Sequence, residues 1–163
     1  MKTLVCAVLA LSAIACQAQS SKWQITDVHD AKKVIAGYIM HTYALGTVRA
    51  DSTQKITSGL RLICASRPST PPIIGVYWDR PMPIENFQYV TVTIDGKKSP
   101  PKQWAQDDSL VFTPFTEIPQ LVKSMTSGKT IKFEWTNQKS ENYTVAFDLE
   151  GMPIKEFNQY CGI

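Results

Sequence analysis

The sequence predicts a mainly β protein, an antiparallel β-sandwich or open barrel with a short C-terminal helix and one disulfide. Three observations lead to this expectation. Apolar and polar residues alternate with period two in a series of short segments, as in strands with one buried face. Ten prolines and eight glycines separate these segments, which is typical of sandwiches and barrels. Two cysteines, Cys64 and Cys161, remain for pairing in the domain that follows the N-terminal segment.

The first half of the domain contains four candidate strands. Residues 23–26 alternate apolar and polar side chains. The aromatic and β-branched content of 34–45 favours a strand, although Asp30 could instead cap a helix there. Segments 60–65 and 73–78 are near-continuous apolar runs, which are typical of strands covered on both faces. The apolar face of the alternative helix would consist of Val34, Ile35, Tyr38 and Ile39.

The middle of the chain predicts a hairpin, a short strand and a helical turn. A strand is expected over 87–94, where Val90, Val92 and Ile94 share one face. Asp95-Gly96 follows, a strong signal for a two-residue hairpin turn. A short strand is expected over 109–113 and a helical turn over 118–125, ending near Gly128. Proline pairs and runs elsewhere mark loops, because proline donates no hydrogen bond to a strand ladder.

The last strands form a second predicted hairpin. Residues 129–135 alternate cleanly, and the polar segment 136–142 is expected to return the chain into a closing strand over 143–148. One face of this closing strand carries Tyr143, Val145 and Phe147.

A short amphipathic helix is predicted after Gly151. Pro153 suits the first helical position, where its missing N–H leaves no bond unmade. Ile154, Phe157 and Cys161 follow at spacings of three and four and form one apolar stripe. Burial of Ile154 and Phe157 would contribute about 1.5–3 kcal/mol each.

Residues 1–18 are predicted to be a secretory signal peptide. Lys2 supplies a positive charge, and the apolar run that follows is too short to span a membrane and ends in small residues. Cleavage is expected between Cys16 and Gln19, which leaves one domain over 19–163. Alternatively, residues 13–16 resemble a bacterial lipobox, with Cys16 as the lipidated residue. The domain is therefore expected to be periplasmic or secreted, or anchored to a membrane only if Cys16 is lipidated.

Cysteine usage agrees with export. Cys6 leaves with the signal peptide, and Cys16 is either removed or lipidated. Two cysteines, Cys64 and Cys161, then remain. An even number of cysteines in an oxidising compartment predicts one disulfide between them. The same two cysteines are not expected to bind a metal, because neither has a second cysteine or histidine at zinc-ligand spacing.

The composition and motifs argue against several functions. Loss of Lys2 leaves 16 basic and 14 acidic side chains, a net charge of +2, which does not favour nucleic-acid binding. The chain has only two histidines, His29 and His41, as candidates for acid–base work at neutral pH, and neither lies in a metal-binding pair or beside a nucleophile motif. We therefore expect no catalytic residue, no metal and no cofactor, and the protein is not expected to be an enzyme.

One surface segment suggests a partner-binding role. Lys97, Lys98 and Lys102 follow the Asp95-Gly96 turn, and Trp104 comes directly after them. Three cations and an aromatic ring on a protruding loop would bind an acidic protein or an anionic envelope component. The alternative is a solvated hairpin tip with Trp104 turned into the core.

Four scattered segments carry a resemblance to a known group. They are a W-x-I strand at 23–25, an L-x-L-x-C strand at 60–64, an Ile-Asp-Gly turn at 94–96, and the ending F-D-L-x-G, helix and cysteine at 147–161. In these the chain resembles the periplasmic accessory proteins associated with type VI secretion and, more distantly, the invasion-associated locus B proteins. The resemblance implies an envelope β-domain with a structural disulfide and no catalytic residues. The chain departs from the group in proline-rich insertions around 68–83.

The expected function is that of an exported cell-envelope β-domain that acts without catalysis as a binding or accessory protein. Two alternatives remain open. The first is a secreted inhibitor of a hostile enzyme such as lysozyme, which would insert a loop into the cleft of its target. The second is a hydrolase whose active site is not visible in the sequence.

Overall fold

A computed structural model describes residues 22–44, 47–49, 58–65, 70–78, 87–107, 109–136, 140 and 142–162. The expected signal peptide and the lipidation candidate Cys16 lie outside the described residues. The proline-containing run at 80–83 lies outside them as well.

The described strands form one eleven-stranded sheet in which all pairings are antiparallel. They lie in the order β1-β2-β4-β5-β9-β8-β6-β10-β11-β3, and β7 pairs with β6. The predicted fold class is therefore confirmed. The strands are β1 (Gln24–His29), β2 (Ile35–Tyr43), β3 (Thr47–Arg49), β4 (Ser58–Ala65), β5 (Ile73–Trp78), β6 (Phe87–Ile94), β7 (Lys97–Lys98), β8 (Lys102–Asp107), β9 (Leu110–Phe112), β10 (Thr130–Thr136) and β11 (Asn142–Asp148).

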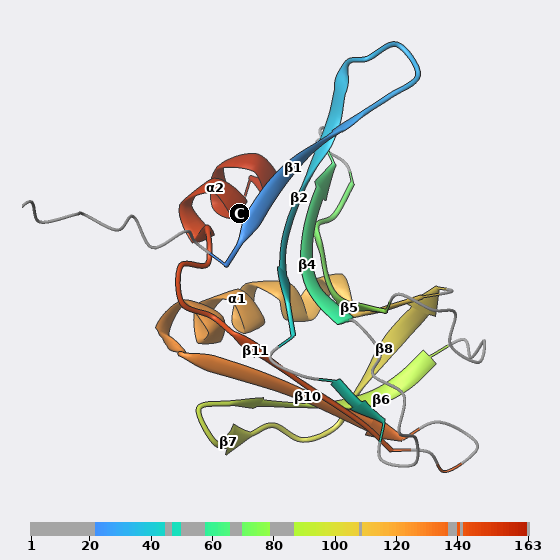
Figure 1. The fold of residues 1–163 in the computed structure, drawn as a ribbon, viewed down its shortest axis with the longest axis vertical. Helices are drawn as coiled ribbons and strands as arrows, with labels where there is room; N and C mark the ends of the chain where they lie inside the picture. Colours follow the sequence, from blue (N-terminus) through green and yellow to red (C-terminus); the bar gives the residue numbers. More distant parts are fainter. Residues whose placement is uncertain are drawn as a thin grey trace, which may run out of the picture.

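The sheet is bent, and its two halves run in different directions. In Figure 1, β1, β2 and β4 run upright, whereas β6, β10 and β11 run across the lower part of the molecule. Helix α1 (Ile118–Ser127) follows the 3₁₀ turn η1 (Phe115–Glu117) and lies between the two halves. Helix α2 (Ile154–Cys161) lies beside β1 and β2 and contacts β2 and β4. No helix in the described part of the chain is long and apolar enough to cross a membrane.

The segment 34–45, for which a strand was favoured over a helix, contains a strand. It forms β2, which pairs with β1 on one side and with β4 on the other. The Asp30 carboxylate oxygen Oδ1 accepts hydrogen bonds from the backbone N–H of Lys32, at 2.8 Å, and of Val34, at 3.0 Å. Asp30 therefore organises the turn between two strands, because these bonds close a hairpin and do not cap a helix.

Aromatic side chains join the two halves of the sheet in the core. Trp78 on β5 lies edge-on to Trp135 on β10, with ring centroids 5.1 Å apart, and to Tyr143 on β11, at 6.0 Å. Trp135 and Tyr143 stack at 5.3 Å. All three rings are 5% exposed or less, and Trp78 is 1% exposed. Such pairs add about 0.5–1.5 kcal/mol each beyond the burial of their area.

The predicted disulfide is present. Cys64 on β4 and Cys161 at the end of α2 are bonded, with Cα atoms 5.1 Å apart, which is a normal separation for a disulfide. Phe157 on the same helix is fully buried, and Tyr160 stacks on Tyr38 of β2 at 3.8 Å. Pro153 occupies the N-cap of α2, one residue before the first helical position that was expected. Both the bond and the stacking hold α2 against β2 and β4.

Candidate functional site

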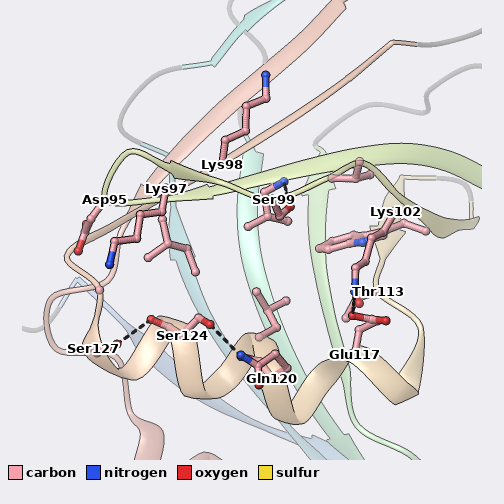
Figure 2. A pocket seen from close by; sticks show the side chains of 16 residues that line it. Asp95, Lys97, Lys98, Ser99, Lys102, Thr113, Glu117, Gln120, Ser124 and Ser127 are labelled. Atoms are coloured by element: carbon pink, nitrogen blue, oxygen red, sulfur yellow. Dashed lines mark hydrogen bonds and ion pairs between the residues drawn. The ribbon is translucent and has the colours of Figure 1, made fainter.

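A cleft of about 450 Å³ lies between α1 and the strands β6, β7 and β8 (Figure 2). We call it the α1 cleft. Four of its lining residues, Lys97, Lys98, Lys102 and Trp104, are the ones that the sequence assigned to a partner surface. The remaining lining residues are Val90, Val92, Ile94, Asp95, Ser99, Thr113, Glu117, Gln120, Leu121, Ser124, Ser127 and Gly128.

The Asp95-Gly96 turn is present but does not project from the sheet. Its backbone φ angles are +46° and +81°, as a two-residue hairpin turn with both φ positive requires. Lys97 and Lys98 then form β7, which pairs with the end of β6. The prediction of a protruding lysine loop is therefore wrong, because the lysines return along β6 and the turn is bonded to another strand.

The Asp95 carboxylate makes that bond, and it closes one end of the cleft. It accepts hydrogen bonds from the backbone N–H of Lys129, at 3.0 Å, and of Thr130, at 2.9 Å, and from the Thr130 hydroxyl, at 3.2 Å. The N–H of Thr130 is the main cause that lowers the pKa of Asp95, followed by the N–H of Lys129. A Cβ added at Gly128 would lie 2.6 Å from Ile94 Cγ2, so only glycine fits where α1 meets β6.

An ion pair closes the other end of the cleft. The Lys102 ammonium at the start of β8 bonds the Glu117 carboxylate at the N-cap of α1. Between the two ends, Ser99 completes the edge of β6: its N–H donates to Val92 O at 2.8 Å, and its Oγ accepts from Val92 N–H at 3.1 Å. The strands and α1 are thus held at a defined distance at both ends of the cleft.

The floor of the cleft is apolar. Val90 on β6 is 1% exposed, and Val92, Ile94 and Leu121 are half-buried. Trp104 is 2% exposed, and its ring lies 5.4 Å from the ring of Phe133 in the core. Of the two predictions for Trp104, the buried position is correct and the exposed aromatic contact is wrong, because its position on β8 points inward. Trp104 contributes to the cleft from below.

The three lysines differ in their electrostatic surroundings. Figure 2 shows Lys97 directed toward α1 and Lys98 directed away from it, as expected for neighbours on a strand. The Lys98 ammonium lies 3.8 Å from the Glu134 carboxylate on β10, and Lys102 is paired with Glu117. Lys97 forms no ion pair with any residue that the structure describes. It is therefore the cation of this cleft that is available to a ligand.

The opposite wall is the polar face of α1. Gln120, Ser124 and Ser127 line the cleft, whereas Ile118, Val122 and Met125 are buried on the other side of the helix. The Ser124 hydroxyl donates to Gln120 O at 3.0 Å, and the Ser127 hydroxyl donates to Ser124 O at 3.3 Å. These three residues were not among the predicted site residues. Their spacing of four and three, between the buried positions, nevertheless indicates that they share one face of a helix.

The two histidines lie elsewhere, on β1 and β2. Burial lowers the pKa of His41, and the nearby Arg61 charge lowers it further. Neither histidine lines the α1 cleft. In the described ranges no three His, Cys, Asp or Glu side chains gather to hold a metal ion.

Comparison with protein-family models, with curated proteins and with solved structures finds no match to this chain. The resemblance to secretion-associated envelope proteins therefore stays a prediction. The described part of the chain combines a bent antiparallel sheet, a disulfide-held C-terminal helix, and a cleft with an apolar floor and a lysine that pairs with none of the described carboxylates.

Proposed function

We propose that the protein is an exported, non-enzymatic binding protein of the cell envelope that holds its partner at the α1 cleft. The observation that carries this proposal is the combination of an apolar floor, which includes Val92, Ile94 and Leu121, with the Lys97 ammonium, which forms no ion pair with the described residues. Binding sites in proteins are typically concave and mostly apolar, with a few polar groups that fix orientation. The volume of about 450 Å³ lies within the range of such sites.

The chemistry of the cleft favours binding over catalysis. Its two carboxylates are committed, since Asp95 bonds the start of β10 and Glu117 pairs with Lys102. General acid–base catalysis needs a group within hydrogen-bond reach of the reacting atom and with a pKa near the working pH. Among the residues that the structure describes, the lining contains lysines, serines and a glutamine but no histidine or cysteine.

Site-specific photo-crosslinking in the producing cell tests the proposal. A photoreactive residue at Ser124 or Ser127 faces the cleft, whereas one at Lys123 is exposed on α1 without lining it. We expect adducts of defined mass from the first two positions and none from Lys123. Charge reversal at Lys97 and Lys98 should reduce these adducts, and equal yields at all three positions would contradict the proposal.

Export is tested separately by the intact mass of the protein recovered from the envelope fraction. We expect an N-terminus between Cys16 and Gln19. A mass that includes Met1 would contradict export through a cleaved signal. A diacylglycerol-sized increment on Cys16 would support the lipid-anchored form.

Inhibition of a hostile enzyme such as lysozyme is a second candidate, and one feature favours it. The β1–β2 hairpin extends beyond the rest of the sheet in Figure 1. Its turn is preorganised by the two hydrogen bonds to Asp30 Oδ1, and Val34 beside it is 60% exposed. Preorganised projecting turns lose little entropy on insertion into a cleft.

A lysis assay decides this second candidate. The purified protein in molar excess should slow lysozyme, and Lys32→Glu with Lys33→Glu at the turn should remove the effect. The same rate of lysis with and without the protein would exclude it.

A further inference from the structure

We propose that the ligand of the α1 cleft is a single-chain anionic amphiphile, with its aliphatic chain along β6 and its carboxylate head at Lys97. This inference rests on the proposed function, since it names the class of ligand for the same site. Four features of the cleft carry it: its length, its apolar floor, the absence of a peptide-binding edge, and its charge.

The segments that line the cleft extend far enough to accommodate an aliphatic chain. Val90, Val92 and Ile94 lie at alternate positions of β6, so they extend over about 14 Å at ~3.4 Å per residue. The facing segment from Glu117 to Gly128 extends over about 16 Å at ~1.5 Å per helical residue. Both ends are closed by the bonds of Asp95 and Lys102. The trough is therefore long and apolar in one direction, as an extended aliphatic chain requires.

Strand β6 offers no free edge to the backbone of a peptide, and β7 is only two residues long. Strand β6 pairs with β10 over residues 91–94, with β8 over 87–90 and with β7 at its end, and Val92 bonds Ser99. On the other wall, the Ser124 and Ser127 hydroxyls already donate to carbonyls of α1. A peptide in the trough would lose water from its N–H and C=O groups and could regain partners only from single side chains such as Gln120, which is costly. An aliphatic chain carries no such groups.

The charge of the cleft favours an anionic head. The lining holds three lysines and two carboxylates, a formal balance of +1. The Glu134 carboxylate lies beside Lys98, and the Glu117 carboxylate lies beside Lys102. Lys97 is therefore the lining lysine that has no ion pair with a described residue. Lys97 is directed toward α1 (Figure 2). Ser127 lies in the C-terminal turn of this helix. Asp95 adds a carboxylate at this end, but it is bonded by the N–H groups of Lys129 and Thr130 and lies near the Lys129 charge. The helix end carries about half a negative charge, so Lys97 and Lys129 together outweigh Asp95 and the helix end.

Isothermal titration calorimetry with dodecanoate, below its micelle-forming concentration, tests the inference on the purified exported protein. We expect one molecule bound per chain. Lys97→Glu should weaken binding by about tenfold or more, because it removes a charged contact and adds repulsion. Ser124→Trp should abolish binding, because the indole fills the trough. Lys123→Glu makes the same charge change on α1 outside the cleft and should leave binding unchanged, and melting temperatures confirm that each variant is folded.

Three results would overturn the inference: no heat of binding with dodecanoate, equal binding to wild type and to the Lys97→Glu and Ser124→Trp variants, or equal binding of dodecyltrimethylammonium. A short acidic peptide is titrated alongside. If the peptide binds at the cleft and dodecanoate does not, the amphiphile is excluded while the proposed binding function stands. If crosslinking from Ser124 and Ser127 fails as well, both proposals fall.

Discussion

The Asp95 carboxylate and Thr130 are joined by two hydrogen bonds, from the Thr130 N–H at 2.9 Å and from its hydroxyl at 3.2 Å to the same oxygen, Oδ1. The two residues are 35 positions apart in the chain. Their contact fixes the β6–β7 turn to the start of β10, directly after α1. It therefore determines how the hairpin and the helix face each other across the cleft.

Asp95→Asn should lower the melting temperature and increase amide hydrogen exchange at Lys129 and Thr130. Asparagine tolerates the positive φ of this position but lacks the charge that strengthens the bonds to the backbone N–H groups. Asp27→Asn on the exposed edge strand β1 is the matched control and should have no effect. Equal exchange rates in wild type and Asp95→Asn would show that the turn is held by other contacts.

Stability should fall in acid, through two carboxylates. The pKa of Asp95 is lowered by N–H groups, and that of Asp148 by the bond from the Lys22 ammonium, at 2.6 Å, and by Glu150 N–H. A group whose pKa is lower in the folded state stabilises the fold above its unfolded value of about 3.9 and loses this contribution as pH falls through the folded pKa. The melting temperature should therefore begin to decline below about pH 6.5, because the folded protein opposes protonation of His41, and fall further below about pH 4 through the two carboxylates.

The variant with Asp95→Asn and Asp148→Asn tests the assignment. Its melting temperature should be lower than that of the wild type at neutral pH, and the difference should shrink toward pH 3. Parallel curves for the two proteins would mean that other groups cause the acid sensitivity.

Removal of the disulfide should be costly, because Cys64 and Cys161 are separated by 97 residues. The chain-entropy model gives about 4–5 kcal/mol for a loop of this size. We expect Cys64→Ala with Cys161→Ala to lose unfolding free energy of this order in urea titrations. Dithiothreitol should destabilise the wild type and leave the double variant unchanged, and a wild type insensitive to reduction would contradict the role of the bond.

Trp78→Ala should destabilise the protein by about 3–5 kcal/mol, the usual cost of removing a buried aromatic ring. The ring is 1% exposed and connects β5 to Trp135 and Tyr143 in the other half of the sheet. Tyr89→Ala on β6 removes an aromatic that is 59% exposed and should cost about 0.5 kcal/mol or less. Chemical denaturation of both variants measures the difference, and similar losses would argue against a core that joins the two halves.

Local patterns in the sequence were sufficient for most strands, for the Asp95-Gly96 turn, for the two helices and for the disulfide. These features can be predicted from the alternation of apolar and polar residues, from turn residues and from the number of cysteines. Each of these is a property of a few neighbouring residues or of the composition. Strands β3, β7 and β8 were not predicted. Thr47–Arg49 and Lys97–Lys98 are too short to show a period, and Lys102–Asp107 contains a single large apolar side chain.

The existence of the α1 cleft and the residues that line it could be established only from the tertiary structure. The pairing of β6 with β10, the contact of Asp95 with Thr130, and the position of α1 against β6 join residues that are far apart in the chain. Such contacts depend on the order of the strands in the sheet. The alternation of apolar and polar residues identifies a strand but does not specify which strand lies beside it. The same lysines that the sequence placed on a free loop therefore lie along β6, with Trp104 beneath them, because hydrogen bonding of the strand and burial of the ring override the polar appearance of the segment.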